Sequence, residues 1–231
     1  MSGAEPLTKL DEDLWVAARP LPLWVCDVGT RMTVMRLGGD LLLVSPVSLD
    51  PALRAALEPL GRVRWVVGPS LVHHLFLGEY AQAHPSAELW GAPGLAAKRP
   101  DLRFQRVLGG EAPPEWEGRV QYLLFEGAPR INEVVFLHRP TRTLVLTDLA
   151  FNVQPGAKNR AKVFHWLVGA GNRFGPHRII RAVIRDREAA RRSLASILAW
   201  DFERIIVTHG DVLERGGREA LRAGFAFLGP P

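Results

Sequence analysis

The chain has 231 residues, of which 47% are hydrophobic and 23% are charged, and its formal net charge is +5. This composition is typical of a globular protein and excludes fibrous and disordered classes. A single cysteine excludes an internal disulfide framework, and no apolar stretch is long enough to span a bilayer. The opening segment MSGAEPLTKLDEDLW is acidic and lacks the apolar core of a secretory signal, so we expect a cytoplasmic protein.

The first half of the chain alternates strand and helix signals. In chain order, the expected elements are strands over 31–37 and 40–45, a helix over 51–60, a strand over 63–68, a helix over 71–84 and a strand over 87–90. Gly38-Gly39 between two apolar runs predicts a tight hairpin. Asp50 is a suitable N-cap for the first helix, and Pro85 ends the second.

The second half adds strands before it returns to alternation. We expect strands over 119–125, 133–138 and 143–147, an irregular insertion over 152–176, a helix over 186–200, a strand over 204–208 and a helix over 214–228. Two groups of strands with helices to cover them indicate a four-layer α/β/β/α sandwich. We expect a single domain over 1–231, with 1–29 as an N-terminal extension.

Polar side chains follow three of the expected strands. His73 and His74 come after the strand over 63–68, Asp148 follows 143–147, and His209 follows 204–208. Imidazoles beside a carboxylate form a good divalent-metal set. Each residue also has a structural interpretation, as a half-buried histidine pair, a turn cap or a strand-to-loop corner. Adjacent histidines point about 100° apart in a helix, so both can bind one ion only if the helix begins after them.

The order of elements over 30–228 resembles the metallo-β-lactamase fold superfamily. The motifs that carry the resemblance are the Gly-Gly-Asp hairpin at 38–40, VVGPSLVHH at 66–74, TDL at 147–149 and IIVTHG at 205–210. In more detail, the sequence is similar to a branch of that fold without an assigned function. The resemblance implies the same four-layer sandwich and a metal site at the ends of the strands.

The resemblance also implies that only part of a two-metal site is retained. In the superfamily's His-x-His-x-Asp-His motif, Pro69 and Leu71 stand where the first two histidines belong, and Ala128 falls near the next. The positions that serve the second metal can all still coordinate an ion; they are His73, His74, Asp148 and His209. Ser45-Pro46 replaces the early Asp-x-Gly turn of active members. This pattern favours one retained mononuclear site.

Two functional hypotheses follow. In the first, the chain is a metal-dependent hydrolase-like protein that acts on a small molecule. His73, His74 and His209 would bind one divalent cation, and Asp148 would be a further ligand or would orient the catalytic water. This set suits Zn²⁺ best and also accepts Fe²⁺ or Mn²⁺. In the second, the chain is a non-catalytic member that binds a small molecule or a partner, and the polar cluster is a relic without metal.

The excess positive charge is concentrated between residues 156 and 192. This segment has ten Lys and Arg residues, opposed only by Asp186 and Glu188. Such a segment suits an anionic substrate, nucleic acid or an anionic membrane, but a solvated helix face with a loop is the interpretation we favour. Asn132-Glu133, just before a strand, is interpreted as a loop anchor rather than a substrate contact. The oligomeric state is left open.

Overall fold

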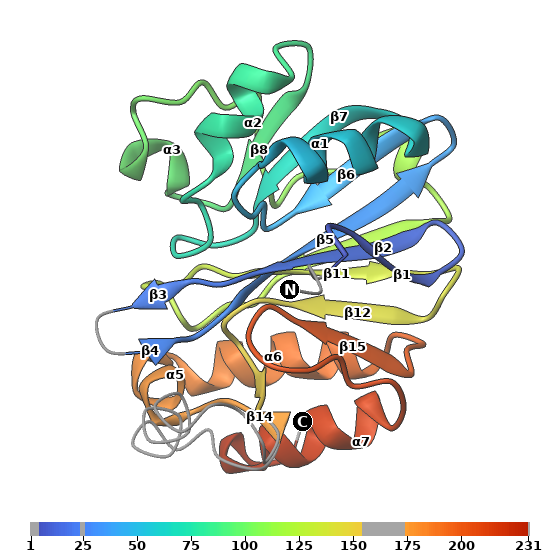
Figure 1. The fold of residues 1–231 in the computed structure, drawn as a ribbon. Coiled ribbons are helices and arrows are strands. Elements are labelled where there is room, and N and C mark those ends of the chain that lie inside the picture. Colours follow the sequence, from blue (N-terminus) through green and yellow to red (C-terminus); the bar gives the residue numbers. More distant parts are fainter. Residues whose placement is uncertain (1–4, 24–25, 154–173, 231) are drawn as a thin grey trace.

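Two facing β-sheets, each covered by helices on its outer side, make up the computed structural model (Figure 1). It describes residues 5–23, 26–153 and 174–230. One sheet has seven strands and the other has four. The expected four-layer sandwich is therefore confirmed.

The first sheet contains the predicted hairpin. Its strands, in spatial order, are β1 (Thr8–Asp11), β2 (Leu14–Arg19), β5 (Thr30–Leu37), β6 (Asp40–Val44), β7 (Arg62–Gly68), β8 (Glu88–Gly91) and β9 (Arg106–Val107). Gly38 has a φ of +69°, which the tight turn between β5 and β6 requires and which glycine adopts without strain. From β6 to β9 the strands are parallel, so their carboxyl ends meet at one edge.

The N-terminal segment belongs to this sheet instead of extending from it. Strand β2 pairs with β5 from Leu14 opposite Met35 to Arg19 opposite Thr30, and Leu14 is fully buried. The turn before it places Asp13 at a φ of +58°, a conformation that aspartate adopts more readily than most residues other than glycine. Strands β3 (Pro22–Leu23) and β4 (Cys26–Asp27) form a separate ribbon.

The second sheet has the order β10 (Val120–Leu124), β11 (Val134–His138), β12 (Thr143–Leu146) and β15 (Arg204–Val207). Strands β12 and β15 are parallel and are joined by a crossover. The crossover begins with β13 (Phe151–Asn152), which pairs with β14 (Phe174–Gly175). Most of the irregular insertion expected over 152–176 lies outside the described residues.

Short helices cover the outer faces of both sheets. Helices α1 (Pro51–Leu57), α2 (Leu77–Ala83) and α3 (Leu95–Lys98) lie on the first sheet, and α5 (Arg178–Val183), α6 (Arg187–Leu198) and α7 (Gly217–Gly224) lie on the second (Figure 1). Short 3₁₀ turns span Glu58–Leu60, Pro114–Trp116 and Ala226–Leu228. The predicted N-cap is confirmed, since the Asp50 side chain accepts a hydrogen bond from the Leu53 amide at 2.7 Å. No helix in the described ranges is both long and apolar enough to cross a membrane.

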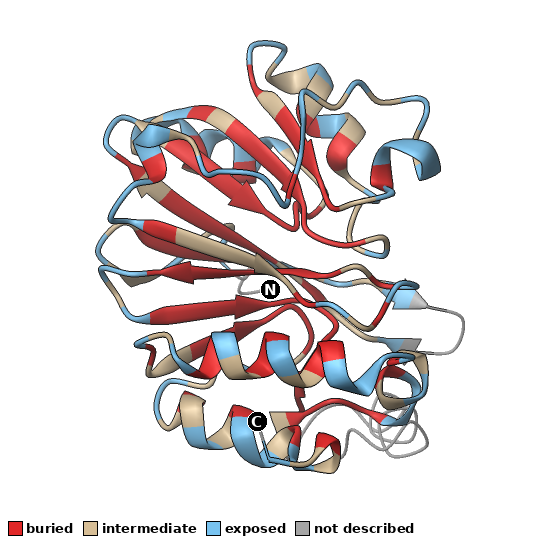
Figure 2. Cartoon of the chain, turned by 180° about the vertical axis from the view of Figure 1, so that it is seen from behind, coloured by how far each residue is buried: buried red, intermediate tan, exposed pale blue. Residues whose placement is uncertain are grey.

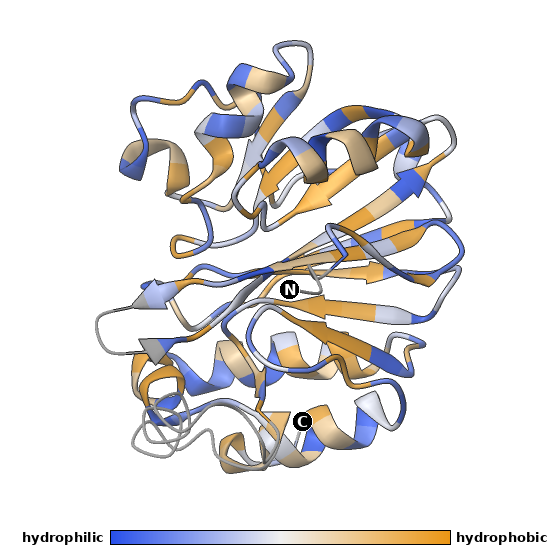
Figure 3. Ribbon diagram, viewed as in Figure 1, coloured by the Kyte–Doolittle hydropathy of each residue, from blue (hydrophilic) through white to orange (hydrophobic). Residues whose placement is uncertain are grey.

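Apolar side chains fill the three interfaces between the four layers. The central strands of both sheets are largely buried and hydrophobic, while the helices are buried mainly on their inner sides (Figures 2 and 3). Between the sheets, Trp116 contacts Trp65 edge-on at 5.7 Å and stacks on Trp90 at 4.9 Å. This packing fixes the strands relative to one another and therefore fixes where their ends lie.

Candidate metal centre

Three polar side chains from distant parts of the sequence meet at the carboxyl ends of parallel strands. His73 follows β7 in the first sheet, and Asp148 and His209 follow β12 and β15 in the second. In sheets built from parallel strands, ligands bind beyond the carboxyl ends, where loops free side chains from packing. The sandwich therefore brings ligand-type residues from both sheets to one edge.

The three side chains are close enough to share one ion. One ligand atom from each of His73, Asp148 and His209 lies within 4.8 Å of the others. Asp148 Oδ2 is 3.2 Å from His73 Nε2, and Asp148 Oδ1 is 3.4 Å from His209 Nε2. The side chains are only 8–10% exposed. The carboxylate therefore lies between two imidazoles in a site that largely excludes solvent.

Both imidazoles are oriented by a hydrogen bond at the nitrogen that faces away from Asp148. His209 Nδ1 donates to the Gly29 carbonyl at 2.8 Å, so Nε2 carries the lone pair when the ring is neutral. His73 Nδ1 and the Ser45 hydroxyl are 2.9 Å apart. Phe151 stacks on the His209 ring at 5.2 Å. Contacts of this kind hold metal-binding histidines in the required tautomer and orientation.

These three positioning residues were not found from the sequence. Ser45 stood out only as a departure from the superfamily's Asp-x-Gly turn, and it has a φ of +57°. The carbonyl of Gly29 carries no sequence signal, because every residue has one. Phe151 lies in a strand of two residues, which is too short to be predicted. Their roles become visible only when the strands are assembled.

The distances between the three side chains can be compared with the distances between the ligands of a bound cation. Two ligand atoms that each lie about 2.1 Å from one tetrahedral ion are about 3.4 Å apart. The two imidazoles lie 3.2 and 3.4 Å from Asp148, each from a different carboxylate oxygen, and both separations are close to this spacing. His73 Nε2 and Asp148 Oδ2 are buried, face each other and make no hydrogen bond, as expected of two lone pairs that share a cation. The residues therefore fit one small divalent ion.

Asp148 and His209 each shift the pKa of the other toward the charged form. Burial raises the pKa of Asp148, but its electrostatic interactions with His73 and His209 outweigh this effect and hold the pKa below its usual value. Burial lowers the pKa of His209, but its interactions with Asp148 outweigh that and raise the pKa. Asp148 is therefore ionised at neutral pH and available as an anionic ligand.

Glu133 fixes the segment that carries Asp148. Its carboxylate is fully buried and accepts hydrogen bonds from the backbone amides of Thr147, Asp148 and Leu149 at 2.6, 2.7 and 2.9 Å. Burial and the neighbouring charge of Asp148 raise the pKa of Glu133 to about 7. Asn132 Nδ2 donates to the Pro93 carbonyl at 3.1 Å. The expected anchoring role of Asn132-Glu133 is confirmed.

His74 is not part of the group of three. The helix expected over 71–84 begins only at Leu77, because the Ser70 hydroxyl accepts hydrogen bonds from the amides of Val72 and His73 and forms a local turn. Within this turn His74 faces Arg99, whose Nη1 is 3.3 Å from His74 Nδ1. Burial, then the charges of Lys98 and Arg99, lower the pKa of His74. A guanidinium at this nitrogen opposes metal binding there.

The positions that correspond to the superfamily's first metal are apolar in the structure as well. Ala128 is 1% exposed and packs in the core between the second sheet and its helices. Pro69 is buried, and the Leu71 amide donates to the Ile131 carbonyl. None of these three side chains can bind a metal. The described residues therefore provide ligands for one ion at this edge.

A cavity of about 360 Å³ opens above the three ligands. His73, Asp148 and His209 line it, and so do His74 and His177. Most of the remaining wall is hydrophobic. The volume lies at the lower end of the range for small-molecule sites, which is about 300–1,000 Å³.

Comparison of the structure with known ones identifies the fold. The metallo-β-lactamase from Hirschia baltica is similar with a TM-score of 0.65 and 14% identity, covering 97% of this chain and 97% of that chain. The metallo-β-lactamase from Pontibacter korlensis is similar with a TM-score of 0.66 and 13% identity, covering 96% and 97%. For the mono-zinc form of the metallo-β-lactamase FIM-1 from Pseudomonas aeruginosa, the TM-score is 0.57 with 14% identity, covering 96% and 92%.

The protein therefore has the metallo-β-lactamase fold, as its sequence motifs implied. Identities this low establish the fold alone. No curated protein shows significant similarity to the sequence. The model of one protein family, described as "Domain of unknown function (DUF4336)", matches residues 11–192, and the chain belongs to this family.

Proposed function

We propose that the protein is a metal-dependent hydrolase-like enzyme that holds one divalent cation between His73, Asp148 and His209. The observation that carries the proposal is the arrangement of these ligand atoms, all within 4.8 Å of one another beside a cavity. Three protein ligands leave a coordination position open, which is typical of catalytic rather than structural zinc sites. A structure with the same fold, that of FIM-1, is described as a mono-zinc form.

Zn²⁺ suits two imidazoles and one carboxylate, and when bound it supplies Lewis acidity and a coordinated water of pKa about 7. His73 and His209 bind through Nε2, since each Nδ1 faces Ser45 or Gly29. Asp148 would supply the negative charge of the ligand set and would orient water beside the ion. The buried walls exclude bulk solvent, which strengthens these electrostatic interactions.

A second candidate is supported by the contact between Asp148 and His209. Their separation of 3.4 Å also suits an ion pair between a carboxylate and a protonated imidazole. In that case the cluster is a buried relic that stabilises the fold, and the cavity binds a small molecule without turnover. Metal content separates the two candidates.

We expect about one equivalent of zinc per chain in protein purified without chelator. His73→Ala and His209→Ala should each reduce this content to below a tenth of an equivalent, because two remaining ligands do not hold zinc. Elemental analysis of the purified variants, with thermal melting to confirm folding, measures the effect.

His74→Ala is the matched control, because His74 adjoins His73 in sequence but faces Arg99. We expect this variant to retain the full metal content. Loss of metal in His74→Ala alone would assign the ion to a different set of residues. Folded wild-type protein that takes up no zinc, iron or manganese would leave the non-catalytic candidate.

Zinc affinity should fall as the pH falls. Interaction with Asp148 raises the pKa of His209, and the ring must be deprotonated to bind an ion. Below that pKa, one competing proton weakens the affinity by about tenfold per pH unit. The pKa of Asp148 is held low, so this residue does not contribute between pH 5 and pH 8. Competition titrations with a zinc indicator at pH 6 and pH 8 test the slope; equal affinities at the two values would contradict it.

A further inference from the structure

The cavity above the ligand group has a distinctly apolar wall. Val28, Pro46, Val72, Leu75, Phe76 and Phe151 line it. Val72 and Leu75 are 47% and 57% exposed, and they are among the large hydrophobic residues that the described part of the chain leaves most exposed. The turn that carries His73 therefore also presents apolar side chains to the entrance. Desolvating these surfaces favours a ligand with an apolar group.

Apart from the candidate metal ligands, the cavity wall contains one lysine. Lys98, at the end of α3, lines the cavity, and its Nζ donates to the Leu71 carbonyl at 2.6 Å. Among the described residues, no carboxylate lies within ion-pair distance of Lys98. The neighbouring Arg99, in contrast, is paired with Asp101 at 2.7 Å. Lys98 therefore presents an uncompensated positive charge beside an apolar surface.

We infer that the protein recognises a small amphiphilic anion, whose apolar group lies on the hydrophobic wall and whose monoanionic group pairs with Lys98. Its role as a substrate rests on the proposed metal-dependent function. The cavity volume of about 360 Å³ is of the size that holds a small molecule. A single lysine favours one negative charge, and an ammonium without a planar fork does not select among carboxylate, sulfonate and phosphate shapes.

Alkyl sulfonates are suitable probes, because they are permanently monoanionic and sulfonate is a poor metal ligand. Binding of pentane-, hexane- and octane-1-sulfonate to protein as purified is measured by calorimetry, with octan-1-ol and octyltrimethylammonium as neutral and cationic probes. We expect affinity to rise by about fourfold per methylene of the sulfonate chain. Among the three head groups, affinity should be highest for the sulfonate, lower for the alcohol and lowest for the ammonium. Equal affinity for all chain lengths, or for all three head groups, would overturn the inference.

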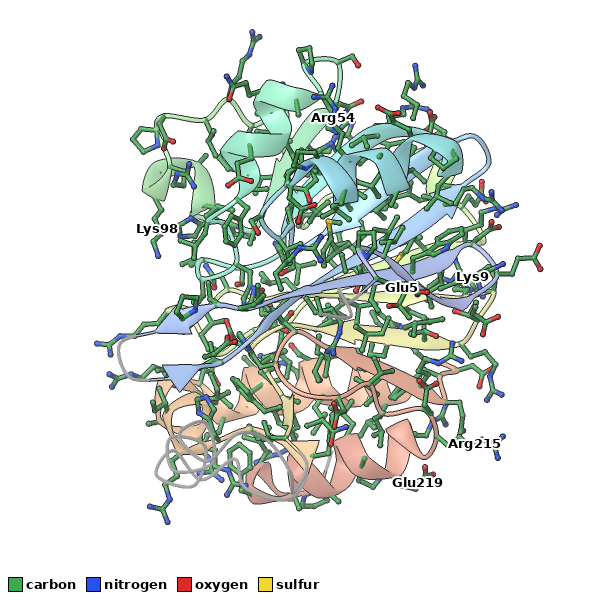
Figure 4. The ribbon with its side chains drawn as sticks, viewed as in Figure 1. Glu5, Lys9, Arg54, Lys98, Arg215 and Glu219 are labelled. Atoms are coloured by element: carbon green, nitrogen blue, oxygen red, sulfur yellow. The ribbon has the colours of Figure 1, made fainter. Side chains whose placement is uncertain are left out.

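Two substitutions separate the apolar and the ionic contributions. Lys98→Met retains most of the side-chain length and should weaken octane-1-sulfonate binding by about three- to fivefold while leaving octan-1-ol unchanged. Leu75→Asn, at an exposed position, should weaken both probes. Lys98→Arg should restore the sulfonate affinity. Lys9→Met is the matched control, because Lys9 lies on the opposite side of the molecule from Lys98 (Figure 4). A Lys98→Met variant that binds the sulfonate like the wild type would remove Lys98 from the site.

The metal content of the same samples keeps this test independent of the proposed function. Lys98 and Leu75 are not ligands, so both variants should retain the wild-type zinc content. Zinc without probe binding would overturn the amphiphilic ligand and leave the metal centre intact. Probe binding without zinc would overturn the hydrolase-like function and support a binding protein with the same ligand preference.

Discussion

Replacing Glu133 with alanine is expected to lower the free energy of unfolding by about 3–5 kcal/mol. The carboxylate accepts three backbone hydrogen bonds, from Thr147, Asp148 and Leu149, and it is fully buried. Without it, three amides lose their partner in a place that water does not reach. The segment that carries Asp148 should then move, and zinc content should fall with stability. Urea denaturation followed by the fluorescence of the seven tryptophans measures the change.

Two further substitutions test whether the buried carboxylate of Glu133 causes the loss of stability. Glu133→Gln retains the shape, but its amide group has a donor where the structure needs an acceptor, so an intermediate loss of about 1–3 kcal/mol is expected. Glu219→Ala removes a glutamate from the exposed side of α7 (Figure 4) and should change the unfolding free energy by less than about 0.5 kcal/mol. A Glu133→Ala variant as stable as Glu219→Ala would show that Asp148 is held by other contacts.

Much of the fold could be predicted because its signals are local. Gly38-Gly39 between two apolar runs marks a hairpin, and the run over 63–68 is a buried parallel strand with few polar residues. Asp50 and Asp186 both cap helices with their side chains. These patterns depend on residues that are close in sequence, so no knowledge of the assembled core is needed.

The expectations that differ from the structure depend on longer-range or finer interactions. Strand β2 is identified by its pairing with β5. Its sequence follows a run of charged residues, and the sequence alone therefore predicts that it belongs to an N-terminal extension outside the sheets. The helix expected over 71–84 has suitable residues throughout, but the Ser70 hydroxyl bonds to the amides of Val72 and His73. A turn therefore replaces its first part.

The candidate metal ligands also divide into those that the sequence indicates and those that it does not separate. His73, Asp148 and His209 could be proposed because they lie in the loops that follow strands, and parallel strands bring their carboxyl ends together. His74 carries the same sequence signal as His73. Only the direction of each side chain separates them, and that direction is set by the turn and by Arg99. The carbonyl of Gly29, which orients His209, could not be distinguished from any other carbonyl.

The positions of the apolar substitutions leave ligand-type side chains for one ion rather than two among the described residues. Ala128 packs in the hydrophobic core, and Pro69 is buried directly after β7, so neither position contains a polar group in need of a partner. In the group of His73, Asp148 and His209, in contrast, every residue has a contact with Ser45, Glu133 or Gly29 that holds it in place. Such supporting contacts are typical of metal-binding residues and favour the proposed centre.

Gly210→Ala is expected to remove metal binding and to destabilise the fold, although Gly210 contributes no ligand. Its φ of +99° is costly for any other residue, by about 1–3 kcal/mol. An added Cβ would also lie 2.2 Å from the Asn152 carbonyl oxygen, which is backbone and has little freedom to move. Asn152 and Gly210 form a β-bridge, and the Asn152 amide donates to the carbonyl of His209. Relieving the clash should therefore shift the backbone beside His209 and disturb the separation between His209 and Asp148.

Gly216→Ala separates this clash from backbone strain. Gly216 has a φ of +69°, but nothing lies within 4 Å of an added Cβ. We expect Gly216→Ala to lose about 1–2 kcal/mol of stability and to retain full zinc content. Gly210→Ala should lose at least twice as much stability and most of its zinc, as measured by urea denaturation and elemental analysis of matched samples. If both variants hold zinc equally, the bridge between Gly210 and Asn152 has no part in positioning His209.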